Sequence, residues 1–422
     1  MTRIKPFKAF HYNPAKVSNF SLVMCPPYDV ISSEEQNEYH NLSPHNFIWV
    51  ELGKERSGDN REENKYTRAK KIFEGWIEKG ILIEDAKPCL YYYKQEYSIL
   101  GQKHSRLGFI SLLKLEQEGQ AGVYPHENTH SHAVEDRQQL WGFLKANLSS
   151  IFVCFSDKNK KVEKIFRQDV VTTTPLIDVT DQGKVRHIIW KLEDPALIAS
   201  ISTELENQNF FIADGHHRYK VAQEIRKERL NKRTKANGDE PFNYVMTYFT
   251  NMDSPDLQIF PLHRVLRRLP GKLDFLEEDF RIDKVKSKED LILLLARAGL
   301  NEHAFGLYTS EGPRLLRLKN KMLIDERIKE GSAAFRRLDA TILKHFIIDR
   351  LGIKSDDILY TKDFSQATWL VDDHQADASF ILNPVRIKQL KEIALNGERM
   401  PPKTTYFYPK VLSGLTIYKF DG

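Results

Sequence analysis

The sequence contains little cysteine and no long apolar run. Only three of its 422 residues are cysteines, and these lie far apart and form no CxxC pair. This excludes a zinc ribbon or a thioredoxin-type motif and argues against a disulfide-bonded scaffold. No apolar stretch approaches the roughly 18 residues of a membrane helix, and the first residues lack the apolar core of a signal peptide. We therefore expect a cytoplasmic protein with no membrane partner.

The sequence also lacks a strong excess of either charge. The 63 lysines and arginines nearly balance the 58 aspartates and glutamates, so that the formal net charge is +5. This balance does not favour a nucleic acid as a partner. Apolar residues make up 41% of the chain and charged residues 29%, which is typical of a folded globular protein. The length predicts two or three domains at roughly 150 residues each.

Helix and strand patterns are mixed along the chain, which predicts an α+β (mixed α/β) protein of several domains. We expect three regions, 1–160, 161–270 and 271–422, each with α+β character. The predicted strands are 90–99 and 106–115 (a hairpin), 151–155, 185–190, 210–213, 244–250 and 378–382, with a strand-like segment at 46–51 and a hairpin at 314–325. The predicted helices are 65–79, 134–146, 197–205, 215–230, 291–300 and 333–351.

The sharpest local signal is the sequence FIADGHHR, in which an apolar strand ends at Asp214 and Gly215 and a helix begins with His216, His217 and Arg218. Backbone N–H groups and the dipole at a helix start favour an anion, and glycine lets the backbone approach it closely. Arginine offers two donors to a phosphate, and histidine can move a proton near neutral pH. The segment predicts a phosphate site; a strand–turn–helix whose histidines only cap or pack is the alternative.

A histidine-rich segment, YPHENTHSH, contains the letters HExxH from His126 to His130. That motif binds zinc when it lies in a helix with both histidines on one face. A proline precedes it, and asparagine, threonine and serine within it favour a loop, so the pattern does not favour zinc. A solvated polar loop is one alternative, and a loop in an active site is the other. The residues expected at such a site are His126, Glu127, Thr129 and the following Arg137.

A third segment, MPPKTTYFYPK at 400–410, joins a stiff pair of prolines to lysines and hydroxyls. Lys403, Thr404 and Lys410 are of the residue types that hold phosphate oxygens. No glycine-rich loop precedes Lys403, which excludes a Walker A motif. An edge strand with aromatic packing is the alternative.

Three shorter signals add candidates. The loop CPPYDVI carries one acid, Asp29, which is either a site residue or a turn cap. The sequence PLHR carries His263 and Arg264, which are either site residues or part of a buried ion pair. Glu51 ends the strand-like segment, and an acid in that place is more often on the surface than a ligand.

Taken in order, these motifs resemble those of one bacterial and archaeal family, the domain-of-unknown-function family numbered one thousand and fifteen. The resemblance covers about residues 3–421 and rests on PPYD, PHExT, DGHHR, PxHR and MPPKxTxFxPK. Two positions depart from the family pattern. Thr404 stands where serine is usual and keeps the hydroxyl, whereas Leu262 stands where threonine is usual and loses it.

The DGHHR segment also resembles the phosphate-binding helix start of the ParB/sulfiredoxin superfold. That group includes ParB-type nucleotide switches, sulfiredoxin and an ADP-dependent free-serine kinase. The resemblance implies a ParB-like strand–turn–helix in the central region. Genes of the family often lie beside genes of serine biosynthesis, which makes free serine and O-phosphoserine the implied substrates.

We interpret the sequence as that of an enzyme that handles a phosphoryl group on a small metabolite, with phosphoserine or serine preferred. Such chemistry is mostly positioning and charge neutralisation. His216 or His217 would act as general acid, and Asp29 or Glu127 would orient the attacking group or hold Mg²⁺. The reaction is either hydrolysis or transfer to or from a nucleotide such as ADP or ATP. The predicted phosphate contacts are Asp214, Gly215, Arg218, Arg264, Lys403, Thr404 and Lys410, with His263 beside them.

Two other functions are consistent with parts of the sequence. A non-enzymatic, ParB-like nucleotide-binding regulator would have DNA as a partner, but the sequence shows neither a helix-turn-helix nor a strongly basic face. A metal-dependent hydrolase built on the histidine segment would require bound zinc. The oligomeric state is left open.

Overall fold

The computed structural model describes residues 3–116, 122–129, 131–169, 173–232, 238–354 and 357–420. The contacts divide the chain into two compact units. Unit 1 comprises residues 1–125, 129–257 and 409–422, and unit 2 comprises residues 126–128 and 258–408. The three regions expected from the sequence stay a prediction. Within the described residues, no helix is long and apolar enough to cross a membrane.

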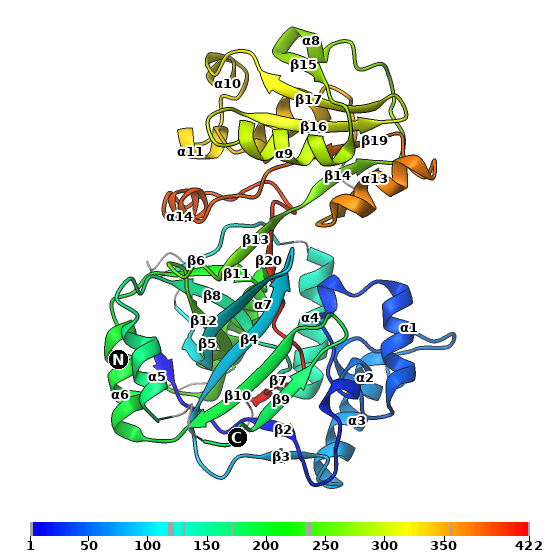
Figure 1. Ribbon diagram of the computed structural model, residues 1–422. Coiled ribbons are helices and arrows are strands. Elements are labelled where there is room, and N and C mark those ends of the chain that lie inside the picture. Colours follow the sequence, from blue (N-terminus) through cyan, green and yellow to red (C-terminus); the bar gives the residue numbers. More distant parts are fainter. Residues whose placement is uncertain are drawn as a thin grey trace. The chain divides into compact units, whose positions relative to one another are not determined.

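Unit 1 is built on a nine-stranded sheet, as far as the structure describes it (Figure 1). Its path is β6-β11-β8-β12-β5-β4-β10-β9, and β1 pairs with β5. The pairs β11–β6 and β12–β8 are parallel, and the other pairs are antiparallel. The strands are β1 (Ile4–Lys5), β4 (Leu90–Ile99), β5 (Gln102–Lys114), β6 (Val123–Tyr124), β8 (Ile151–Phe155), β9 (Ile177–Thr180), β10 (Arg186–Leu192), β11 (Phe210–Asp214) and β12 (Tyr244–Asn251).

Both faces of this sheet are covered, which explains why its strands read as nearly continuous apolar and aromatic runs. On one face, Phe109 and Phe249 stack with ring centroids 4.9 Å apart. Tyr248 points to the opposite face because side chains alternate along a strand, and there its ring lies 5.5 Å from the guanidinium of the buried Arg106. Gly108 permits this packing, since a Cβ at that position would lie 2.3 Å from the Phe249 carbonyl oxygen.

The helices of unit 1 form two groups. In the first, α7 (His216–Asn231) contacts β8, β12 and α4 (Ser131–Leu144), and α4 in turn contacts α3 (Lys65–Glu78). In the second, α5 (Lys161–Asp169) contacts α6 (Pro195–Leu205). The remaining elements of unit 1 are η1 (Phe20–Leu22), η2 (Tyr28–Val30), α1 (Ser33–Leu42), α2 (Ile48–Glu51), η3 (Pro241–Asn243), and the paired strands β2 (Phe10–Tyr12) with β3 (Leu82–Glu84) and β7 (Ala146–Asn147) with β21 (Tyr418–Lys419).

In its described residues, unit 2 contains a six-stranded antiparallel sheet of order β15-β17-β16-β19-β14-β18 and a separate β13–β20 pair. Buried apolar residues of α9 and α13 form one of its core clusters (Figure 1). Its strands are β13 (Gln258–Pro261), β14 (His263–Leu266), β15 (Phe280–Lys284), β16 (Ala304–Thr309), β17 (Gly312–Leu318), β18 (Ile358–Thr361), β19 (Ala378–Ile381) and β20 (Thr405–Tyr408). Its helices are α8 (Leu276–Asp279), α9 (Lys288–Ala298), α10 (Met322–Arg327), α11 (Ala333–Arg336), α12 (Asp339–Leu343), the π-helix η4 (Lys344–Ile348), α13 (Phe364–Asp372) and α14 (Ile387–Leu395).

The mixed α/β class is confirmed, and three local predictions are wrong. The strand-like segment 46–51 contains the helix α2, whose first N–H, from Ile48, donates to the side chain of Asn46 at 2.9 Å. The long helix expected over 333–351 is broken into α11, α12 and η4, since Leu338 is extended. The hairpin over 314–325 ends after β17, because Asn320 accepts the N–H of Met322 at 2.9 Å and α10 begins there.

Candidate functional site

The strand–turn–helix predicted from FIADGHHR is present in unit 1. Strand β11 ends at Asp214, and α7 begins at His216. Gly215 between them has φ +84°, a left-handed conformation that disfavours other residues. A Cβ on Gly215 would lie 3.0 Å from Nε of Arg218. Because glycine has no side chain, it provides no side-chain cap, and the first turn of α7 presents backbone N–H groups in the way that suits an anion.

Arg218 is held beneath this turn by two hydrogen bonds. Its side chain is only 2% exposed. One terminal nitrogen donates to the Ser150 carbonyl at 2.6 Å and the other to Oδ2 of Asp214 at 2.8 Å. Nε has no hydrogen-bond partner among the described residues. Burial opposes the charge on Asp214, but Lys410, which pairs with Oδ1, and Arg218 outweigh it and lower the pKa of that carboxyl.

A second buried arginine, Arg137 of α4, lies in the same cluster. Its guanidinium stacks 4.2 Å from the ring centroid of Tyr28. It donates to the Glu51 carbonyl at 2.7 Å and, from Nε, to Oδ2 of Asp136 at 2.9 Å. Burial works against the charged form of Arg137, yet Glu51 and Asp136 raise its pKa. The arginine is therefore charged and fixed in orientation.

Glu51 lies inside this cluster, so its assignment as a surface acid is wrong. It is 1% exposed. Oε1 accepts from the Ser149 hydroxyl at 3.1 Å and lies 3.9 Å from Arg137, whereas the buried Oε2 has no hydrogen-bond partner in the described part of the chain. Burial raises the pKa of Glu51, although Arg137 and Arg218 partly offset it. Helix α2 turns this residue inward.

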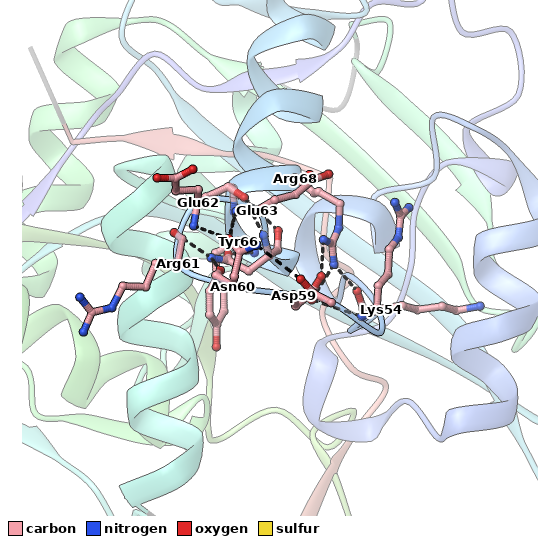
Figure 2. A network of polar contacts seen from close by, with 12 residues as sticks. Lys54, Asp59, Asn60, Arg61, Glu62, Glu63, Tyr66 and Arg68 are labelled. Atoms are coloured by element: carbon pink, nitrogen blue, oxygen red, sulfur yellow. Dashed lines mark hydrogen bonds and ion pairs between the residues drawn. The ribbon is translucent and has the colours of Figure 1, made fainter.

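Asp136, the partner of Arg137, is itself fixed from outside the cluster. Its Oδ1 accepts from the Tyr66 hydroxyl at 2.9 Å and from Lys65 at 2.8 Å, both at the start of α3. Figure 2 shows the polar loop that leads into that helix. Arg68 of α3 donates back to both carboxylate oxygens of Asp59 in this loop, at 2.6 and 2.8 Å. Burial opposes ionisation of Asp136, but Arg137, Lys65 and Tyr66 lower its pKa to about 2.

Eight of the sequence-predicted site residues lie in this part of unit 1. Asp29 is exposed on η2, and its charge raises the pKa of Arg218, which burial opposes. His216 is buried, and its charge acts on Asp214. A ninth predicted residue, Thr129, belongs to unit 1 as well but is not counted among these eight, and it is exposed. The eight residues are Asp29, Arg137, Asp214, Gly215, His216, His217, Arg218 and Lys410.

The other predicted site residues belong to unit 2. They are His126, Glu127, His263, Arg264, Lys403 and Thr404.

The histidine segment is held against the strand β20 within unit 2. Nε2 of His126 lies 3.2 Å from the Thr405 hydroxyl, and its carbonyl accepts from Met400 at 2.8 Å. Residues 126–129 are not helical, so the helical geometry of a zinc-binding HExxH is absent there, and His130 lies outside the described residues. Among the residues that the structure describes, no group of three or more histidines, cysteines, aspartates or glutamates could hold a metal ion.

The segment from Met400 forms a turn and then the strand β20. Lys403 is exposed and has φ +54°, and the Thr404 hydroxyl donates to the carbonyl of Pro401. Strand β20 pairs with β13, where Tyr408 stacks on Phe260 with ring centroids 5.0 Å apart. Aromatic packing thus accounts for much of this segment.

His263 of β14 is also engaged within unit 2. Its Nδ1 accepts from the Leu382 N–H at 3.3 Å. Burial and the neighbouring Arg264 lower its pKa to about 4.

Sequence reasoning missed three components of the cluster: Glu51, Asp136 and the ring of Tyr28. One signal for Glu51 was available, because it directly follows the apolar run FIWV. If that run is buried, the side chain next to it is expected to be buried as well. Asp136 gave no signal of its own, because its role depends on the packing of α3 against α4.

Comparisons with known proteins place the chain in a family. No curated protein matches it. Among solved structures, a free serine kinase in complex with AMP is 13% identical, covering 71% of this chain and 86% of that one, with a TM-score of 0.37. SbnI from Staphylococcus aureus, with a C-terminal truncation, is 11% identical, covering 72% and 85%, with a TM-score of 0.38. A conserved hypothetical protein from Pyrococcus furiosus is 12% identical, covering 72% and 92%, with a TM-score of 0.35.

The family comparison covers far more of the sequence than any single motif. Residues 4–341 match DUF1015, described as a protein family of unknown function. This is more than half of the chain and includes the PPYD, PHExT, DGHHR and PxHR motifs. The chain therefore belongs to the DUF1015 family.

Proposed function

We propose that unit 1 is a phosphoryl-transfer site for a small metabolite, with O-phosphoserine or serine as the preferred substrate. The observation that carries the proposal is a cluster of three cations, each paired with a carboxylate. Arg218 and Lys410 pair with Asp214 directly before α7, and the buried arginines Arg137 and Arg218 both act on Glu51. Fixed cations beside the backbone N–H groups of a helix start neutralise the charge of a phosphoryl group without reorganising during the reaction. The preference for serine rests on the resemblance of the DGHHR segment to that of a free-serine kinase.

The acids of the cluster fall into two groups with different roles. Asp136 and Asp214 accept hydrogen bonds from Arg137 and Arg218 and so orient these donors. Glu51 has a buried oxygen, Oε2, that no described residue engages, and burial raises its pKa. A carboxylate of raised pKa is suited to take up a proton. We assign Glu51 as the general base and Asp29 as the group that orients the attacking hydroxyl.

In the proposed step, the attacking oxygen forms a bond to phosphorus as the bond to the leaving oxygen breaks. The proton of the attacking group passes to Oε2 of Glu51. His216, at the first position of α7, protonates the leaving oxygen. The attacking group is water in hydrolysis of phosphoserine, and it is the serine hydroxyl in transfer from a nucleotide.

The first experiment measures the release of inorganic phosphate from O-phosphoserine and the interconversion of AMP, ADP and ATP with serine, with and without Mg²⁺. The test variant is Arg218→Ala. The matched control is Arg186→Ala, which removes an arginine of the same unit whose ion pair with Asp178 lies on the surface. We expect turnover in the wild type and in the control and its loss in Arg218→Ala.

Two results would contradict the proposal. Full turnover in Arg218→Ala would show that the cluster is not the phosphate site. Tight nucleotide binding by calorimetry with no turnover of any substrate would instead support a nucleotide-binding regulator.

A further inference from the structure

A buried arginine in unit 2 lacks the ionic partners that its counterparts in unit 1 possess. Arg264 lies on β14 and is 5% exposed. It donates to the Leu262 carbonyl, and its guanidinium lies 5.3 Å from the ring centroid of Tyr360. Among the described residues, no carboxylate forms an ion pair or a hydrogen bond with it. Arg137 and Arg218 each have such a partner.

This difference has an energetic consequence. A guanidinium withdrawn from water loses its hydration, and only a counter-ion with good geometry restores that free energy. Burial lowers the pKa of Arg264 to about 10, and Tyr360 and Glu127 offset only part of the effect. The pKa values of Arg137 and Arg218 are instead raised, because nearby carboxylates outweigh burial. Arg264 thus holds a buried positive charge that the described residues leave largely uncompensated.

Arg264 lines a cavity that provides space for a ligand atom beside its guanidinium. The cavity has a volume of about 20 Å³, which admits about one water-sized group. Four residues that line this cavity also line a second cleft, which has a volume of about 410 Å³. The shared residues are Asp339, Asn383, Pro384 and Gln389. A ligand could therefore place a small anionic head beside Arg264 and its remaining atoms in the cleft.

The charges of the larger cleft favour an acidic ligand. Lys321 and Arg386 line it. Of its two acids, Glu302 is held by Arg317 at 2.9 and 3.0 Å, and Asp339 accepts from His303 at 2.8 Å. The acids are thus engaged with Arg317 and His303. Among the described residues, Lys321 donates to the backbone carbonyl of Asn301 and Arg386 to that of Gly299.

We propose that Arg264 binds the carboxylate of a small organic acid, whose remaining atoms occupy the adjoining cleft of unit 2. A planar carboxylate matches the two parallel donors of a guanidinium. Its edge also suits the small volume beside Arg264 better than a tetrahedral phosphate does. The proposal does not depend on the function of unit 1.

The test is calorimetric titration of the full chain with succinate, glutamate and citrate, and with inorganic phosphate for comparison. The variants are Arg264→Gln, Arg264→Lys and the control Arg281→Gln, which removes an exposed arginine of the same unit. We expect a carboxylate to bind the wild type and the control equally, and Arg264→Gln to bind about tenfold more weakly or worse, as the loss of a charge-assisted hydrogen bond implies. Arg264→Lys keeps the positive charge but loses the two parallel donors of the guanidinium, so its affinity for the carboxylate should lie between those of the wild type and Arg264→Gln.

Folding and ligand class are tested in the same samples. Without ligand, Arg264→Gln should unfold at a temperature no lower than the wild type, since it removes an uncompensated buried charge. Three results would overturn the proposal: no carboxylate binds the wild type, Arg264→Gln binds it as well as the wild type does, or phosphate binds through Arg264 more tightly than any carboxylate. A failure of turnover in unit 1 would leave all three measurements unaffected.

Discussion

Replacing Asp136 by asparagine should destabilise the protein in a way that depends on pH. The carboxylate is buried between Arg137, Lys65 and Tyr66, and its pKa is about 2. An unfolded aspartate has a pKa of about 3.9, so the difference of about 1.9 units corresponds to about 2.6 kcal/mol of stability at neutral pH. Because the folded-state pKa is depressed, this stability is present above about pH 4 and is lost as the pH falls toward 2.

Urea unfolding at several pH values measures this contribution. The difference in unfolding free energy between the wild type and Asp136→Asn should be nearly constant from pH 7 to pH 5 and should shrink by about 1.2 kcal/mol between pH 5 and pH 3. The control, Asp178→Asn, breaks the exposed pair with Arg186 and should change stability by less than about 1 kcal/mol. A difference for Asp136→Asn that stays the same from pH 7 to pH 3 would refute the reasoning.

Three further changes test the cluster directly. Glu51→Gln should abolish turnover but keep nucleotide binding measured by calorimetry, and unchanged turnover would show that Glu51 is not the general base. Because burial raises the pKa of Glu51, the activity of the wild type should rise with pH through a value above the ordinary carboxylate range. Gly215→Ala should lower the free energy of unfolding by roughly 1–2 kcal/mol, because φ +84° is strained for alanine and its Cβ would press on Arg218; equal stability in urea unfolding would contradict this. Lys410→Met should weaken phosphoserine binding and raise the pKa of Asp214, and NMR of the Asp214 carboxyl carbon would measure that pKa. An unchanged pKa would show that Lys410 does not stabilise the charged form of Asp214.

Local patterns predicted those helices and strands whose ends are marked in the sequence by glycine or other turn residues. The hairpin of β4 and β5 followed from two β-rich runs around Gly101, and the β11–α7 junction followed from Asp214 and Gly215. The helix α2 was missed because an apolar run of a few residues has no readable period. The break at Leu338 was missed because nothing within 333–351 is a helix breaker, and the extended residue is set by tertiary packing.

The candidate site divides in the same way. Residues beside a strand end or helix start, such as Arg218, were predictable because chemistry and local structure coincide in one segment. Glu51 and Asp136 depend on helices that are distant in sequence and meet only in the fold. Neighbours along the chain can indicate that an acid is buried, as the apolar run before Glu51 does, but they do not identify the side chains that it contacts.

The discontinuity of unit 1 has a consequence for the order in which the protein folds. Lys410 pairs with Asp214, and β21 pairs with β7, only after the chain has passed through residues 258–408 of unit 2. If unit 2 were still unfolded, closing a loop of about 150 residues would cost about 4 kcal/mol of chain entropy. Prior folding of unit 2 removes most of that loop. During synthesis, Lys410 is the last residue of the cluster to emerge from the ribosome, so a nascent chain carries an incomplete cluster until unit 2 has been made.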